Sequence, residues 1–335
     1  MKNEKTQIII MSVGLILAVA LLAGILVPAV PVVKRMQEDA AAAAVTETTL
    51  PEETWPEVVS DENVTNIMLV GHNYREDEPN YLSDTMILCS INRETKTMTM
   101  VSIMRDLLVP LPAYAGHTAG RNRINVCYAL GSSWTGSSEG GMEMLAMCVE
   151  QNFDIPVHHT IEVDFQSFVT IIDYMGGVEV DVSEAEAKYM TENVGYVGDV
   201  QPGLQTLDGM ATLAYARIRG IDNDRVRTGR QRNVIMSLIE KVRDLNVWDL
   251  YRVVNNLLPF IKTDMTTEEI ANYIWEFLPM VKDLELDSLT CPVDNETLPG
   301  SYWSGMIDLY GTPASVVECD FQLNSDYLKD VLGVS

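Results

Sequence analysis

TNIMLVGHNYREDEPNYLSDTMILCSINRETKTMTMVSIM, residues 65–104, contains three short apolar runs separated by polar segments. The runs at 65–71, 84–91 and 97–104 are rich in β-prone residues, and the last begins by alternating Thr with Met, the period of a strand. The polar segment 92–96 is short enough to join the second and third runs through a hairpin turn. We therefore expect three neighbouring strands of one sheet.

Helical and strand-like segments alternate through the rest of the chain. The pattern at 164–177 predicts a helix that begins after Asp164 as its cap and ends at two glycines. Strands interleaved with helices on this scale predict an α/β (α+β) fold, a three-layer sandwich with a central mixed β-sheet flanked by helices. The other expected elements are helices at 207–219, from Arg227 onward and at 266–281, and strands at 155–163, 178–182 and 284–293.

The N-terminal part differs from the rest of the chain in composition. Residues 8–33 carry no charge over 26 positions, more than the roughly 20 residues that cross a bilayer, and predict one transmembrane helix. A cleaved secretory signal is the alternative, although the apolar core of such a signal spans only about 7–15 residues. The prediction divides the chain into a cytoplasmic tail at 1–7, this anchor, an acidic disordered stalk at 34–62 and one extracytoplasmic domain at 63–335.

Charge and cysteine content exclude some classes of function. The net charge of −25 argues against a surface that binds nucleic acid or anionic lipid. The five cysteines show none of the CxxC or Cys/His spacings typical of zinc sites. In an extracytoplasmic domain, disulfides between Cys127 and Cys148 and between Cys291 and Cys319 remain open, because connectivity is not readable from sequence.

Against this acidic background, the segment YARIRGIDNDRVRTGRQR at 215–232 holds six arginines. Like charges this close repel one another, so the segment needs an anion. On a helix that begins near Arg227, Gln231 lies four residues on and on the same face. If the preceding chain is extended, Arg217 and Arg219 project to one side, because side chains alternate along an extended chain.

Two interpretations of the arginine segment follow. Several guanidinium groups on converging segments suit a diphosphate, because each planar fork binds two phosphate oxygens. The alternative is a surface on which Asp222, Asp224 and other acids neutralise the arginines. The spacing therefore predicts either a diphosphate-binding site or a network of salt bridges.

The order of several motifs resembles the LytR-CpsA-Psr family from about Asn66 to the end of the chain. The motifs are SDTMILCSIN, SIMRD, RINVCYALG, LDGMATLAYARIR and RTGRQRNV, and their combination is what makes the resemblance specific. The resemblance implies an extracytoplasmic phosphotransferase, dependent on Mg²⁺ or Mn²⁺, anchored by one span in the cell membrane of a Gram-positive-type envelope. Such proteins move a glycopolymer of the teichoic acid or capsular polysaccharide type from an undecaprenyl diphosphate carrier to peptidoglycan, forming a phosphodiester.

The resemblance also implies roles for individual residues. Asp84 matches a metal-ligating acid in an SDT motif, and Arg105 matches the arginine of an RD motif. The apolar helices expected around 144–149 and 168–175 would line a tunnel for the polyprenyl tail. The implied catalytic residues are Asp84, Arg105, Arg217 and Asp224, and the implied diphosphate ligands are Arg105, Arg123, Arg217, Arg219, Arg227 and Gln231.

One position departs from the family pattern. Family members carry an acid two residues after the glycine that ends the first strand, whereas Asn73 stands there in GHNYR. Its carbonyl oxygen can ligate Mg²⁺ but brings no charge, so we expect Asp84 and Asn73 to form a metal site with a weakened hold on the ion. A non-catalytic polyprenyl-diphosphate binder or scaffold and a lipid-diphosphate hydrolase are therefore the alternative functions.

Overall fold

The computed structural model describes residues 58, 60–72, 82–117, 120–193, 200–243, 256–277, 280 and 283–334. The predicted cytoplasmic tail, the predicted anchor and nearly all of the predicted stalk lie outside these ranges, as does Asn73. Within the ranges, no helix combines the length and the apolar character that a membrane span requires.

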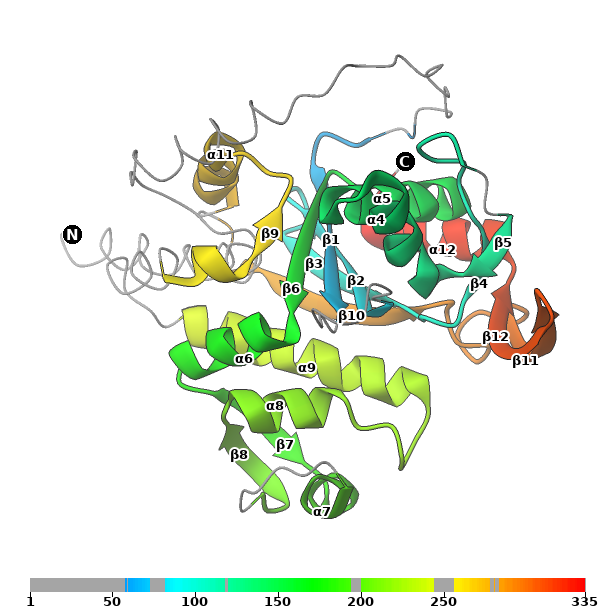
Figure 1. Cartoon of the computed structure of the whole chain (residues 1–335). Helices are drawn as coiled ribbons and strands as arrows, with labels where there is room; N and C mark the ends of the chain where they lie inside the picture. Colours follow the sequence, from blue (N-terminus) through cyan, green and yellow to red (C-terminus); the bar gives the residue numbers. More distant parts are fainter. Residues whose placement is uncertain are drawn as a thin grey trace.

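A six-stranded sheet forms the centre of the domain, with its strands in the order β10-β3-β2-β1-β6-β9 (Figure 1). The pairs β1–β2, β2–β3 and β6–β9 are antiparallel, whereas β1–β6 and β10–β3 are parallel, so the sheet is mixed as expected. The strands are β1 Val64–His72, β2 Ser83–Asn92, β3 Thr97–Ile103, β6 His159–Asp164, β9 Lys262–Thr263 and β10 Glu285–Cys291.

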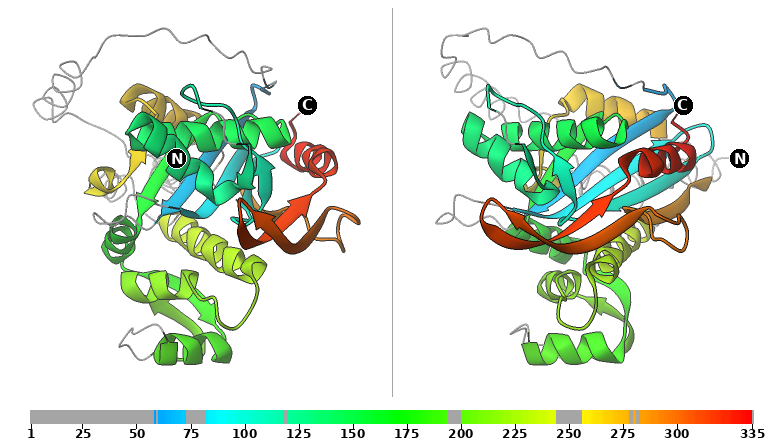
Figure 2. Two further views of the ribbon diagram at one scale, coloured as in Figure 1. Left: turned by 45° about the vertical axis from the view of Figure 1, so that its right-hand side comes forward. Right: turned by 90° about the vertical axis from the view of Figure 1, so that its right-hand side faces the viewer.

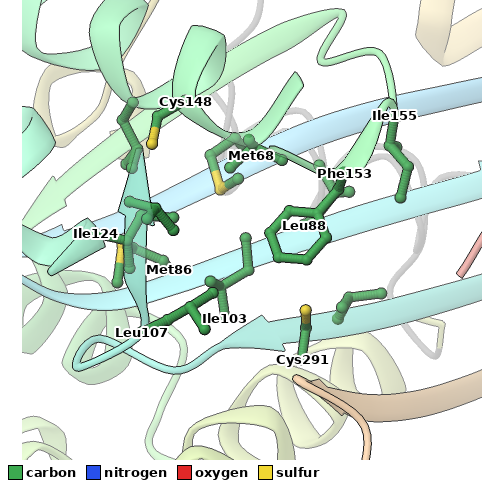
Figure 3. Close-up of a cluster of buried hydrophobic side chains, with 14 of the residues drawn as sticks. Met68, Met86, Leu88, Ile103, Leu107, Ile124, Cys148, Phe153, Ile155 and Cys291 are labelled. Atoms are coloured by element: carbon green, nitrogen blue, oxygen red, sulfur yellow. The ribbon is translucent and has the colours of Figure 1, made fainter. Parts of the chain in front are cut away.

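Helices cover both faces of this sheet, because its central strands are apolar on both sides. On β1, Ile67 and Leu69 enter one core cluster while Met68 and Val70 enter the other, as strand alternation requires. Figure 3 shows part of the second cluster, in which Phe153 lies close to strand residues such as Leu88. The first cluster includes residues of α6 Phe165–Tyr174, α9 Asp224–Arg243 and α11 Thr267–Phe277, and the second includes residues of α4 Cys127–Thr135, α5 Ser138–Phe153 and α12 Phe321–Leu332.

A smaller unit lies on the far side of α9 from the sheet (Figures 1 and 2). It has its own apolar cluster, to which Val178, Met190 and Tyr215 belong, and α9 contributes Val234 and Leu238. Two further strand pairs extend from the main sheet. The unit consists of β7 Val178–Val182, α7 Glu184–Asn193, β8 Gly203–Leu207 and α8 Gly209–Ala216, and the strand pairs are β4 Leu108–Pro110 with β5 Arg121–Arg123 and β11 Tyr302–Leu309 with β12 Thr312–Cys319.

Sheet topology brings chemically active residues to one edge. The parallel strands β1 and β6 end at the same edge, and β3 and β10 end there as well because β2 reverses direction between β1 and β3. For the same reason β2 begins there, with Asp84 as its second residue, while Arg105 follows β3. The carboxyl ends of strands in α/β proteins commonly carry the binding site, so we expect the functional site at this edge.

Several sequence predictions are confirmed and others are wrong. The hairpin between β2 and β3 turns at 93–96, and Asp164 caps α6 by accepting a hydrogen bond from the amide of Ser167. The helix expected at 207–219 ends at Ala216, and the strand expected at 155–163 begins only at His159. All five cysteines are buried free thiols, so neither disulfide that the sequence left open is present. Burial raises the pKa of the Cys89 thiol to about 12, which leaves it protonated and unreactive.

The close contact between α4 and α5 depends on glycine. A Cβ atom at Gly131 would lie 2.2 Å from the carbonyl oxygen of Gly140, whereas a Cβ at Gly229 in α9 would meet only a guanidinium nitrogen of Arg232, at 3.9 Å. We expect Gly131→Ala to lower the free energy of unfolding by about 1–3 kcal/mol. Gly229→Ala should raise it by about 0.5–1 kcal/mol, because alanine restricts the unfolded helix segment. Urea denaturation of both variants checks this, and equal effects would contradict the close contact.

Candidate functional site

An apolar pocket opens between the sheet and the helices α6, α8 and α9, and its empty space, with the open solvent at its mouth, is about 1070 Å³. Residues of β1, β2 and β6 line one side of it, and residues of α6, α8, α9 and the segment just after α8 line the rest. Its apolar lining includes Leu69, Ile87, Ile161, Phe168, Leu213 and Val234. A pocket with so few polar groups binds hydrocarbon better than water or sugar.

Charged and polar side chains line the same pocket where it reaches the carboxyl edge of the sheet: Asp84, Arg217, Arg219, Arg227 and Gln231. Asp84 is placed there by the start of β2, and Arg217 and Arg219 lie just after α8. The helix α9 carries Arg227 and Gln231 one turn apart on its pocket side, as their spacing predicted. We call this group of five residues, with Arg105 and Asp224, the pocket mouth.

Asp84 holds two arginines of the pocket mouth together. Its Oδ1 accepts a hydrogen bond of 2.7 Å from Nη2 of Arg219 and one of 3.1 Å from Nη1 of Arg105. The Asp84 and Arg105 side chains are 24% and 23% exposed, so the pair is partly screened by solvent. The carboxylate therefore fixes where two guanidinium groups point, although it neutralises only one of them.

Arg227 is the most buried charge of the pocket mouth, at 2% exposure. Its Nη2 lies 2.7 Å from Oδ1 of Asp224, which in turn lies 3.8 Å from Nε of Arg105. Its Nε and Nη1 have no hydrogen-bond partner in the described part of the chain. Burial lowers the pKa of Arg227, with Asp224 opposing the shift and the neighbouring Arg105 and Arg219 adding to it. A buried cation with unfilled donors is arranged to receive an anion.

Two more predicted residues complete the wall of the mouth. The guanidinium of Arg217 lies over the ring of Phe165, 4.6 Å from its centroid, which holds a long side chain in one position. Gln231 donates a weak hydrogen bond to the carbonyl of Ala216, and its Oε1 is buried without a partner among the described residues. Both side chains thus line the same opening as Arg227.

Arg123 is connected to the pocket mouth through Asp106. Its Nη1 donates to Oδ1 of Asp106 at 3.3 Å, and Oδ2 of Asp106 lies 3.6 Å from Nε of Arg105. Arg123 is not part of the pocket lining. Asp106, which the sequence analysis did not single out, is therefore the bridge between Arg123 and the pocket mouth. Its position beside Arg105 in the RD motif was the available signal.

The other three arginines of the 215–232 segment do not reach the pocket. Arg230 is buried against Glu186, whose Oε1 lies 2.5 Å from its Nε, and against Asp222. Burial would raise the pKa of Glu186, but hydrogen bonds from Arg230 and Ser183 outweigh it and hold the pKa below the usual value. The salt-bridge interpretation is therefore right for Arg230, whose charge internal carboxylates neutralise.

Of the two helix segments that were expected to line the tail pocket, only one does so. Phe168 and Ile171 of α6 line the pocket, as predicted for 168–175. The segment 144–149 does not, because Met144, Leu145 and Cys148 belong to the core cluster on the opposite face of the sheet. The helix α8, which supplies Leu213, was not expected to line it.

Asp84 is the natural first ligand for a divalent cation at the mouth. No group of three or more His, Cys, Asp or Glu side chains in the described ranges is arranged to hold a metal ion. Mg²⁺ usually binds one or two carboxylates and completes its shell with phosphate oxygens and water. Asp84 could supply the carboxylate of such a shell.

The fold and the site define a class: a mixed α/β domain whose apolar pocket ends in a group of arginines around one carboxylate. The model of the LytR_cpsA_psr family matches residues 32–310, and the chain belongs to this family.

Named relatives agree with this assignment. The chain is 29% identical over 231 residues to the polyisoprenyl-teichoic acid–peptidoglycan teichoic acid transferase TagT of Bacillus subtilis, covering 67% of each protein. It is 30% identical over 224 residues to the TagU transferase of Oceanobacillus iheyensis, covering 66% of this chain and 65% of that protein. The matches thus span about two thirds of the length of these relatives.

Solved structures share the fold. A structure of TagT bound to LIIa-WTA has a TM-score of 0.62 at 24% identity, covering 82% of this chain and 92% of that one. A structure of TagT with bound octaprenyl pyrophosphate lipid has a TM-score of 0.58 at 23% identity, with the same coverage.

Arg227 and Arg230 should differ in what they do for stability. Arg230→Met leaves Glu186 and Asp222 without their cation, so we expect a loss of about 3 kcal/mol in the free energy of unfolding. Arg227→Met removes a buried cation whose partner Asp224 still has Arg105, and should change stability by about 1 kcal/mol or less. Urea denaturation at neutral pH measures both. Because the pKa of Glu186 is depressed in the folded protein, the difference in stability between the two variants should be full above the usual pKa of a glutamate. It should shrink as the pH falls below that value and through the lowered pKa.

Proposed function

We propose that this protein transfers a glycopolymer from a polyprenyl diphosphate carrier to peptidoglycan. The carrying observation is the apolar pocket that ends at Arg217, Arg219 and Arg227. A polyprenyl diphosphate has a hydrocarbon tail and a multiply charged head, and the pocket is complementary to both parts. The names of TagT and TagU describe teichoic acid transfer to peptidoglycan, and one TagT structure holds an octaprenyl pyrophosphate.

The finer parts of the proposal come from the family resemblance and, for the anchor, from the sequence. We expect the carrier to be undecaprenyl diphosphate and the polymer to be of the teichoic acid or capsular polysaccharide type. The uncharged segment 8–33 would anchor the chain in the cell membrane, with the domain outside the cell. The reaction would then take place where the carrier presents its polymer and where peptidoglycan lies.

The pocket mouth supports phosphoryl transfer through charge and position. Transfer needs the non-bridging oxygens neutralised and the attacking hydroxyl held in line, and it needs little covalent chemistry from the protein. Arg227, buried and with unfilled donors, would bind the diphosphate together with Arg217 and Arg219, which line the same pocket. Asp224 orients Arg227 and Arg105, since it lies between their guanidinium groups.

Mg²⁺, or Mn²⁺ in its place, belongs to the proposal as a bound cofactor. Asp84 would hold it, with Asn73 as the second ligand that the family resemblance implies. When bound, the ion neutralises charge on the diphosphate oxygens. The arginines of the pocket mouth would neutralise part of the same charge. Asp84 would therefore have two roles, holding the metal and positioning Arg105 and Arg219.

The full-length chain in detergent tests the function. With a lipid-linked teichoic acid precursor and peptidoglycan, we expect wild-type transfer and a loss of about a hundredfold or more in Arg227→Gln and Asp84→Ala, because each removes preorganised charge. Arg243→Gln is the control, since Arg243 lies at the other end of α9 and pairs with Glu240. Mass spectrometry of copurified lipid should find polyprenyl diphosphate. Transfer that persists in Asp84→Ala and Arg217→Ala would refute the proposal.

The same assay separates the alternatives. A binder or scaffold would retain polyprenyl diphosphate without transferring polymer, and a hydrolase would release the polymer without peptidoglycan.

Metal dependence gives a separate prediction. Removing divalent ions with EDTA should abolish transfer, and added Mg²⁺ should restore it. Asn73→Asp adds a charged oxygen ligand, so the Mg²⁺ concentration for half-maximal activity should fall by about tenfold. An unchanged Mg²⁺ dependence would show that position 73 does not contact the ion.

A further inference from the structure

The helix α9 has a second cationic face that the pocket does not use. Arg225, Thr228 and Arg232 are three and seven residues apart and so share one side of the helix. This side packs against the carboxyl ends of β3 and β10, where Ser102 and Thr290 are register partners on neighbouring parallel strands. Nη1 of Arg232 donates to the hydroxyl oxygens of both, at 2.7 Å and 3.0 Å.

Arg225 extends the same face toward the β11–β12 hairpin. Its Nη2 donates to the carbonyl of Pro292 at 2.7 Å, just after β10. Its guanidinium lies over the ring of Tyr302, 4.5 Å from the centroid. Both contacts fix the direction of the side chain and neither supplies negative charge.

These two arginines lack a counter-charge within the described ranges. Arg219, Arg227 and Arg230 each have a carboxylate within 4.0 Å, whereas Arg225 and Arg232 contact only hydroxyls, a carbonyl and a ring. The Nε atoms of both are buried and have no hydrogen-bond partner in the described part of the chain. Burial, and after it the charge of Arg225, lowers the pKa of Arg232 to about 10, so Arg232 remains charged at neutral pH.

The absence of a local acid is informative because acids are abundant. The chain carries 48 Asp and Glu against 23 Lys and Arg, yet the described residues place none against this pair. Holding two guanidinium groups together without an anion costs free energy, both from repulsion and from lost hydration. A ligand oxyanion would offset that cost.

The location identifies which substrate would bring this anion. The tail pocket lies below β1, β2 and β6, and the second face lies below β3 and β10, on the other side of the pocket mouth. Arg225 directly follows Asp224 of that mouth. A donor whose tail and diphosphate occupy the first side leaves the second side to the acceptor.

We propose that Arg225 and Arg232 bind a carboxylate of the peptidoglycan acceptor. The inference rests on the proposed function, because that function supplies the acceptor. Peptidoglycan carries carboxylates on its peptide stems, and a guanidinium group can bind a carboxylate through two parallel hydrogen bonds. The pair would place the acceptor strand so that its hydroxyl reaches the diphosphate at the pocket mouth.

Equilibrium binding of a muramyl disaccharide–peptide fragment to the full-length chain tests this by calorimetry. We expect Arg232→Gln to raise the Kd by about tenfold or more, as for loss of a charged hydrogen bond. Arg232→Lys, which keeps the charge, should recover part of the affinity. The matched control Arg243→Gln should leave the Kd unchanged. A fragment whose carboxylates are amidated should bind wild-type and Arg232→Gln equally weakly.

Lipid binding separates this inference from the proposed function. Arg232→Gln should bind polyprenyl diphosphate as tightly as wild type, whereas Arg227→Gln should not. In the transfer assay, Arg232→Gln should raise the KM for the acceptor and leave the KM for the lipid-linked donor unchanged. The inference is overturned if the fragment does not bind, if Arg232→Gln does not weaken it, or if the donor KM changes instead. Failure of wild type to bind the lipid diphosphate would instead refute the proposed function alone.

Discussion

The buried charge of Arg227 is the constraint around which the site is arranged. A guanidinium that is 2% exposed beside an apolar pocket has lost most of its hydration. The short contact with Asp224 offsets part of the free energy that this lost hydration costs, but Arg105 and Arg219 nearby add positive charge. The net field at the pocket mouth is therefore positive and only partly relieved by water. A doubly phosphorylated head group fits such a field, and its hydrocarbon tail fits the pocket behind it.

The sheet topology explains why the charges meet at that place. If β2 ran parallel to β1 and β3, Asp84 would lie at the opposite edge from Arg105. Because β2 is antiparallel to both, its first residues lie beside the ends of β1 and β3. Asp84 then receives hydrogen bonds from Arg105, which follows β3, and from Arg219, which follows α8. Three distant parts of the sequence are joined by one carboxylate.

Features that depend on the spacing of neighbouring residues could be predicted from the sequence. Strand alternation, the Asp164 cap and the four-residue spacing of Arg227 and Gln231 were all readable from neighbouring residues. They were insufficient for Arg230, whose partner Glu186 is 44 positions away and whose role is structural.

The two apolar helix segments show the same limit. Residues 144–149 and 168–175 look alike in sequence, yet they lie on opposite faces of the sheet. Which face a helix covers is set by chain connectivity and packing, not by its own composition. The resemblance to a family supplied the roles of Asp84 and Arg105, which no local pattern specifies.

The arginines that α9 carries point to three different sides of the helix, and each side has a different charge environment. One side carries Arg227 and Gln231 toward the pocket. A second side carries Arg230 toward Glu186, where internal carboxylates neutralise it. A third carries Arg225 and Arg232 toward the ends of β3 and β10. Because the helix separates these groups, their mutual repulsion is smaller than their sequence spacing suggests. Of the three sides, only the second carries enough internal acid to neutralise its arginine, so a net demand for anions remains on the two that flank the pocket mouth.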